Sequence, residues 1–183
     1  MATLTANNSF LQRLLGAMAL DRAIYEEVEG DRSATTQAFA VVVLSSIAAG
    51  FGARGFAENT ASIIAFNSVV SLLAWAAWAL VIFQIGGRLM PESETRVDVG
   101  ELLRTIGFAS APGLLRVLGA LPNATLPVFA ITSGWMLLAM VVAVRQALDY
   151  RSTAKAVAVC VLGWILALVF AIVLGLLLGP SVS

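Results

Sequence analysis

The side chains that most enzymes use for chemistry are almost absent from this chain. It contains no histidine, and its single cysteine is Cys160. An imidazole triad, a histidine-ligated haem, a zinc site of Cys and His ligands and an internal disulfide are therefore excluded. We expect no enzymatic activity, no metal and no cofactor. Cys160 falls within an apolar run, where we expect its thiol to be inert.

Arg116 is the residue that most suggests a site, because it lies inside a weakly apolar run at 102–121. A charge near the centre of a membrane-spanning helix costs about 2.5–3.5 kcal/mol on insertion scales, and less where the side chain reaches an interface. A helix rises about 18 Å from Arg104 to Arg116, which places Arg104 at the cytoplasmic boundary and Arg116 near the opposite one. Headgroup anchoring is the favoured interpretation of Arg116, and a substrate or lipid-phosphate site is the alternative.

Two pairs of opposite charge have helical spacing at the cytoplasmic border. Glu101 and Arg104 are three residues apart, and Arg145 and Asp149 are four apart, so each pair can meet on one helix face. Exposed ion pairs contribute little stability, and a charged lip that docks a partner is the functional alternative. No Asp or Glu falls well inside an apolar run, which argues against a proton relay and coupled transport.

The uncharged polar residues inside the apolar runs are interpreted as bonds between helices. Asn67 and Ser71 are four residues apart in one run, and Thr132 and Ser133 lie in another. Such bonds contribute about 0.6 kcal/mol each, and a permeation path is the less favoured alternative. The four tryptophans lie nearer to the middle of their runs than to the ends. We expect them to pack between helices rather than to line a lipid or pigment site.

These residues must be positioned by membrane-spanning helices. The 183 residues are 60% hydrophobic and 12% charged, with a mean hydropathy of +0.92, whereas soluble domains are about 45–50% apolar and about 25% charged. Apolar runs of about 17–25 residues predict an all-α polytopic membrane protein with five transmembrane helices. We expect Pro112 to kink the third, which neighbouring helices must then shield. The predicted spans cover residues 34–51, 61–85, 102–121, 128–144 and 156–178.

Residues 1–33 form a cytoplasmic N-terminal region that precedes the five-helix transmembrane domain of residues 34–183. Ser9 and Gln12 have the spacing of a capping box, and an apolar stripe with the period of an amphipathic helix continues from there to Val28. We expect one helix from Ser9 to Val28 in the membrane interface. A connector packed under the bundle is the favoured interpretation, and a curvature-sensing or partner-binding helix is the alternative.

The orientation follows from the positive charges, because Lys and Arg in short loops concentrate on the cytoplasmic side. With five spans, nine of the eleven Lys and Arg residues fall on the side of the N-terminus, and only Arg54 and Arg116 fall on the other. We therefore expect a multi-pass protein of the cytoplasmic (inner) membrane with a cytoplasmic N-terminus and a C-terminus on the opposite side. The formal net charge is zero, which argues against nucleic acid as a partner.

The third predicted span also carries a family resemblance. It reads RTIGFASAPGLLRVLG at 104–119, with an aromatic residue, small residues and a proline at 108–112, and a charged AVRQALDYRSTAKAVAV segment precedes the last span. With the five-span plan, these features resemble the Yip family of integral membrane proteins, in particular its small bacterial members. Eukaryotic members bind prenylated Rab-type GTPases and take part in vesicle traffic and membrane shaping. Their Asp-Leu-Tyr-Gly-Pro sequence has no counterpart here, so the resemblance implies the fold and topology rather than the GTPase.

Together these features predict a non-catalytic integral membrane protein that organises the membrane or binds partner proteins. Its expected partners are the lipid bilayer and a membrane protein or second copy of the chain. One alternative is a passive channel, carrier or lipid-moving protein whose path follows the third span, and another is an accessory subunit of a larger membrane complex. The candidate lipid or partner contacts are Arg104, Arg116, Pro112, Phe108 and Glu101.

Overall fold

The structure is a computed structural model that describes residues 8–54, 61–93 and 95–178, with side chains for all of these except 54 and 170–178. Every regular element within these ranges is a helix. The elements in chain order are α1 (Phe10–Met18), α2 (Arg22–Gly30), α3 (Ala34–Arg54), α4 (Ala61–Ile82), the π-helix η1 (Phe83–Leu89), α5 (Val99–Ala109), the 3-10 helix η2 (Ala111–Ala120), α6 (Thr125–Ala147) and α7 (Thr153–Leu178).

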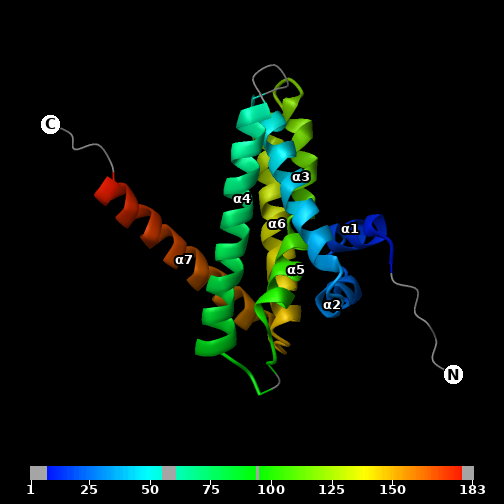
Figure 1. Cartoon of the computed structure of the whole chain (residues 1–183), viewed down its shortest axis with the longest axis vertical. Coiled ribbons are helices and arrows are strands. Elements are labelled where there is room, and N and C mark those ends of the chain that lie inside the picture. Colours follow the sequence, from blue (N-terminus) through cyan, green and yellow to red (C-terminus); the bar gives the residue numbers. More distant parts are fainter. Residues whose placement is uncertain (1–7, 55–60, 94, 179–183) are drawn as a thin grey trace.

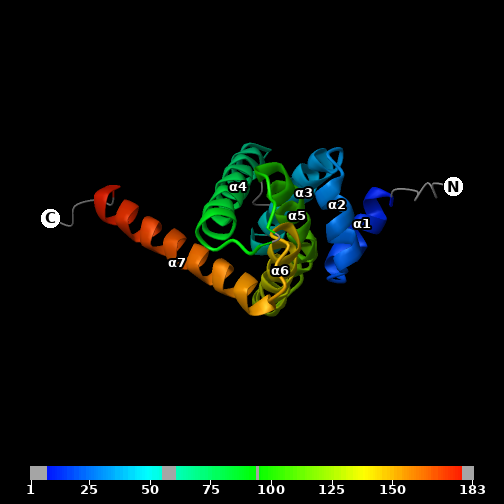
Figure 2. The same cartoon turned by 90° about the horizontal axis from the view of Figure 1, so that it is seen from below.

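The helices form an upright bundle with two attachments. α3, α4, α6 and α5 with its continuation η2 stand side by side, and α1 and α2 cross one side of this bundle (Figure 1). α7 leans away from it, on the side opposite to α1 and α2 (Figure 2). The α1–α2 pair and α7 therefore contact different faces of the bundle.

Three helical stretches are long and apolar enough to cross a membrane, judged by length and composition. They are Ala34–Ala53, Ala61–Leu89 and Thr125–Ala147, and they correspond to the first, second and fourth predicted spans. The second is longer than predicted because η1 continues α4 to Leu89. The apolar part of α7 with described side chains, Thr153–Val169, is shorter.

The third predicted span, 102–121, is not one continuous α-helix. At Ser110 the α-helix gives way to the 3-10 helix η2, because Pro112 has no backbone N–H to donate. The Ser110 carbonyl instead accepts from the Gly113 amide at 2.9 Å and from the Ser45 hydroxyl of α3 at 2.8 Å. The expected kink is thus a change of helix type, and a neighbouring helix adds a second donor to the Ser110 carbonyl at the junction.

Small residues bring α3 close to both parts of this broken segment. A Cβ atom built on Gly107 of α5 would lie 2.7 Å from the Ala38 Cβ, and one built on Gly52 of α3 would lie 1.9 Å from the carbonyl oxygen of Arg116. Glycine is required where two backbones approach so closely. α3 therefore fixes the positions of α5 and η2, which carry Arg104 and Arg116.

The predicted helix from Ser9 to Val28 is wrong in one respect, because it is two helices. Leu20 has a positive φ of 61°, and the Asp21 side chain then caps the start of α2. A left-handed residue followed by a new N-cap ends one helix and starts another. The capping box of Ser9 and Gln12 is confirmed. We call residues 8–31 the α1–α2 cap.

Apolar packing attaches the α1–α2 cap to the bundle. Tyr25 and Val28 of α2 are fully buried, in one core cluster with Ala38 of α3 and Phe108 of α5. The Tyr25 hydroxyl donates to the carbonyl of Ala17 in α1 at 3.2 Å. The cap is consequently a packed part of the fold, as the connector interpretation expects.

Candidate functional site

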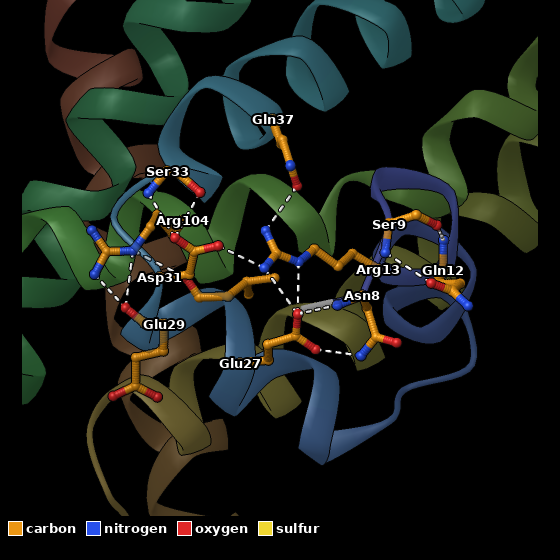
Figure 3. Close-up of polar contacts among 11 residues, drawn as sticks. Asn8, Ser9, Gln12, Arg13, Glu27, Glu29, Asp31, Ser33, Gln37 and Arg104 are labelled. Carbon is orange, nitrogen blue, oxygen red and sulfur yellow. Dashed lines mark hydrogen bonds and ion pairs between the residues drawn. The ribbon is translucent and has the colours of Figure 1, made fainter. Parts of the chain in front are cut away.

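A charged network centred on Arg13 joins the two helices of the α1–α2 cap and reaches α3 of the bundle. Arg13 points inward from α1 and is only 1% exposed. Its guanidinium donates to the Glu27 carboxylate at 2.9 Å, to Asp31 at 2.6 Å and to the side-chain oxygen of Gln37 at 3.1 Å (Figure 3). Glu27 belongs to α2, Asp31 caps the end of α2, and Gln37 lies in the first turn of α3. One side chain thus ties three helices together.

Both carboxylates around Arg13 are held in their charged form. Burial alone would raise the pKa of Glu27, but hydrogen bonds from Asn8 and Arg13 outweigh burial and lower that pKa below its usual value. Asp31 accepts hydrogen bonds from Ser33 and Arg13, which lower its pKa to about 2. The buried guanidinium is therefore neutralised by paired charges, as a buried charge requires.

Arg104 joins α5 to the cap, but not through its predicted partner. Its guanidinium donates to the carbonyl oxygens of Val28 at 3.0 Å and Glu29 at 2.9 Å, near the end of α2. The last carbonyls of a helix lack helical donors, and a cation beside them also interacts favourably with the helix dipole. Glu101 accepts instead from the Asp98 amide at 2.8 Å, within the capping box of α5. The predicted Glu101–Arg104 pair does not form between these two described side chains.

The Glu29 carboxyl at this junction lies near three other acids. Burial is the main cause that raises its pKa to about 7, and the charges of Asp149, Glu101 and Glu26 add to the effect against the opposing charge of Arg104. Glu29 consequently changes its charge near neutral pH.

The predicted Arg145–Asp149 pair is also replaced, here by contacts of Arg145 to backbone carbonyls and to a hydroxyl. Arg145 donates to the Tyr150 carbonyl at 3.1 Å and to the Thr153 hydroxyl at 2.9 Å, while Asp149 is exposed with a φ of 52°. The Tyr150 hydroxyl lies 2.9 Å and 2.7 Å from two carbonyl oxygens in η1 and just after it. The loop between α6 and α7 is therefore attached to the end of the second span.

Two further candidate contacts face the interior. Phe108 is fully buried beneath the cap, and Pro112 is buried at the start of η2. Neither presents a surface to a molecule outside the bundle, so we interpret both as packing residues.

Arg116 turns into the bundle rather than outward to an interface. Its Nε donates to the Thr132 hydroxyl at 3.3 Å and one Nη donates to the Ser133 hydroxyl at 2.9 Å. The guanidinium carbon also lies 5.2 Å from the ring centre of Phe129. Among the residues with described side chains, no carboxylate pairs with Arg116. The side chain instead lines a cavity of about 640 Å³ between α3, α4, α6 and η2.

The polar bonds around this cavity bear out part of the sequence interpretation. Ser71 of α4 donates to Ser46 of α3 at 3.0 Å, which confirms Ser71 as a link between helices. The indole N–H of Trp75 donates to the Leu103 carbonyl at 3.0 Å, and that of Trp135 donates to a carbonyl at the end of α1 at 2.7 Å. These two tryptophans pack between elements, as predicted.

Sequence reasoning did not single out Arg13 as a candidate site residue. One available signal was its position three residues after Phe10 and four before Ala17, on the inward face of α1. An arginine on such a face is buried only with partners. The other signal was the spacing of four residues between Glu27 and Asp31, which places two carboxylates on one side of a helix.

The fold and these contacts define a multi-pass membrane protein whose regular elements, within its described residues, are all helices and which carries a docked N-terminal cap. The Yip1 domain family model matches residues 18–174, and since this is well over half of the chain, the protein belongs to the Yip1 family. This family consists of membrane proteins and is not known for enzymatic activity. Neither a curated protein nor a solved structure matches the chain.

Proposed function

We propose that this protein is non-catalytic and organises the membrane surface through α1, which the bundle holds as an interfacial helix. The observation that carries the proposal is the outer face of α1, where Leu11 and Leu15 are 60% and 57% exposed. The charge of Arg13, between them in sequence, is buried against the bundle. An exposed apolar face on a docked helix suits the boundary between headgroups and acyl chains.

The two helices of the cap differ in the face they present outward. The exposed positions of α2 include Arg22 and Glu26, which suit water and headgroups rather than hydrocarbon. α1 would therefore lie deeper in the membrane than α2. Because Arg13 and Arg104 attach the cap to two helices of the bundle, α3 and α5, α1 would act as a fixed wedge in one leaflet.

We further propose that α5 and η2 together make the third of five crossings. The 11 residues of α5 rise about 16 Å and the 10 residues of η2 rise about 20 Å, which together exceed the hydrocarbon thickness of about 30 Å. An odd number of crossings and the excess of Lys and Arg on the N-terminal side support a cytoplasmic N-terminus and a C-terminus on the opposite side. A bacterial cytoplasmic membrane is the location we propose.

Removal of residues 1–30 is a poor test of this function. It would uncover the buried Phe108 and take away the carbonyl groups that accept from Arg104. Loss of activity would then report a damaged bundle. Substitutions on the outer face of α1 avoid this problem.

The sharper test replaces Leu11 and Leu15 by Ser together. Their exposed parts contribute about 2–3 kcal/mol on transfer to the membrane, so L11S/L15S should bind the interface weakly. We expect wild-type protein to shift the diameter distribution of proteoliposomes in a way that grows with the protein-to-lipid ratio, as measured by electron cryomicroscopy, and L11S/L15S to abolish that shift.

The matched control is the A23S/E26S double variant, which alters two exposed positions of α2 and should behave as wild type. Equal vesicle diameters for wild type and L11S/L15S would refute the proposal. A different result would make α1 a protein-docking surface. In that case a protein that cross-links to α1 in wild type would no longer bind L11S/L15S, and the vesicle diameters would be the same for both.

A further inference from the structure

Three neighbouring cavities form one groove that leads from Arg116 toward α7. The cavity of about 640 Å³ shares Arg116, Trp78, Met136 and Met140 with a second cavity of about 390 Å³. The second shares Met140 and Trp164 with a third of about 500 Å³ between α6 and α7. The shared side chains place the three cavities next to one another, in a row that one elongated ligand can follow.

The groove is open toward the side because α7 leaves the bundle. α4 and α7 meet at Gly163, where a Cβ atom would lie 3.0 Å from the Trp78 ring. At the next residue, Trp164 packs edge-on against Trp78 with ring centres 6.0 Å apart. Beyond this contact α7 diverges from α4 and α6 (Figure 1). In a bilayer, that opening faces lipid.

The end of the groove near α3 and η2 carries donors that the described residues leave unused. Arg116 has five N–H donors, and the hydroxyls of Thr132 and Ser133 accept from two of its nitrogens. Trp78 lines the same two cavities, and its buried indole N–H finds no acceptor within the described part of the chain. A cation and an unused donor in membrane-embedded protein favour a ligand with negative charge and several acceptor oxygens.

The other end of the groove offers only apolar surface. Its walls are side chains such as Leu137 and Val141 of α6 and Ile165 and Leu168 of α7. Such a surface fits hydrocarbon chains and offers nothing to a small anion. The ligand that matches both ends is therefore amphiphilic, with an anionic head and an apolar tail.

From this arrangement we propose that the chain binds one anionic phospholipid, with its phosphate at Arg116 and its acyl chains along α4, α6 and α7. A free phosphate would occupy the Arg116 end alone. An apolar helix from a second copy would fill the α7 end but bring no charge to Arg116. The inference does not depend on the function proposed for α1, since α7, which lines the groove, lies on the side of the bundle opposite to α1 (Figure 2).

The first test uses Arg116→Gln with Arg88→Gln as its matched control. Arg88 also stacks on a phenylalanine ring, at 5.2 Å from the centre of Phe83, but it is exposed and lies outside the groove. Full-length protein in mild detergent is mixed with equal amounts of phosphatidylglycerol and phosphatidylcholine, and bound lipid is counted by native mass spectrometry. We expect wild type and R88Q to retain one phosphatidylglycerol, and R116Q to lose about tenfold in preference for it.

The second test blocks the apolar part and leaves the charge in place. Ala167 lines the groove next to Trp164, so Ala167→Trp should expel the lipid. Leu166 is 52% exposed and lines none of the three cavities, so Leu166→Trp should retain it. Gel filtration and circular dichroism establish that each variant is folded, and Arg116→Lys, which keeps the charge, should keep most of the preference.

Three results would overturn the proposal. One is equal retention of the two lipids by wild type, or an unchanged preference in R116Q. Another is displacement of phosphatidylglycerol by inorganic phosphate, together with binding of inorganic phosphate by A167W. That result would make Arg116 a simple anion site. The third is a dimer that forms only when lipid is removed and that A167W prevents, which would place a second copy in the groove.

Discussion

Replacement of Arg13 by Gln should release α1 from α2 and α3. The guanidinium is the one group that contacts α2, the C-cap of α2 and α3 together, through Glu27, Asp31 and Gln37. R13Q would leave two carboxylates facing each other with side chains only 19% and 17% exposed. Removal of one partner from a buried ion pair costs about 3–5 kcal/mol.

The lower end of that range applies here, because other donors remain. Asn8 still donates to Glu27 and Ser33 still donates to Asp31, and both carboxylates can regain some water. We therefore expect the free energy of α1 undocking to fall by about 3 kcal/mol, a change of about 100-fold in the undocking equilibrium.

Hydrogen exchange of the α1 amides measures this equilibrium directly. α1 has 9 residues, and isolated helices shorter than about 12–15 residues are marginal in water, so undocked α1 exchanges freely. Exchange across Phe10–Met18, followed by mass spectrometry in detergent or nanodiscs, should be about 100-fold faster in R13Q. Arg32→Gln, an exposed arginine just after the cap, should leave exchange unchanged. Equal exchange in R13Q and wild type would refute the reasoning and show that apolar packing alone holds α1.

Three further changes should have measurable effects. The Glu29 carboxyl, whose pKa is raised, stabilises the docked cap most below its ordinary pKa and loses that contribution as pH rises toward about 7. The protection factors of the α2 amides, which divide out the intrinsic pH dependence of exchange, should therefore fall between about pH 4.5 and 7, and Glu29→Gln should remove this fall. Gly107→Ala should lower the thermal midpoint by forcing its Cβ against Ala38 at a cost of about 1–3 kcal/mol, whereas Gly134→Ala, which meets nothing within 4 Å, should not. Tyr150→Phe should also lower the thermal midpoint, because a carbonyl left unsatisfied lowers the free energy of unfolding by about 1–3 kcal/mol. An unchanged midpoint would contradict the role of the Tyr150 hydroxyl.

The long helices could be predicted because a membrane span leaves a strong signal in sequence. The apolar runs at 34–51, 61–85 and 128–144 correspond to α3, α4 and α6, and lipid supplies the environment for most of their surface. Local signals near helix starts were equally readable, as Ser9 and Gln12 show. Each of these features depends on residues within a few positions of one another.

The partners of the arginines could not be predicted in this way. Arg104 bonds to carbonyl groups 75 and 76 residues earlier in the chain, whereas helical spacing points to Glu101, three residues away. The Glu101–Arg104 pair does not form because the Glu101 carboxylate caps its own helix, and because the carbonyl groups at the end of α2 need a donor. Arg104 reaches these carbonyl groups because the α1–α2 cap docks on the bundle, and docking depends on the burial of Tyr25 and Val28.

The position of Arg116 follows from the geometry of η2. An α-helix turns about 100° per residue and a 3-10 helix about 120°, so the five steps from Ala111 to Arg116 rotate the side chain by about 100° more than an α-helix would. The same tight winding adds about 0.5 Å of rise per residue. The break at Pro112, with its Ser110 carbonyl held by Ser45, therefore determines which way Arg116 points. The rise along a regular helix places Arg116 near an interface, and the extra rotation of the 3-10 helix turns its side chain into the groove beside Trp78.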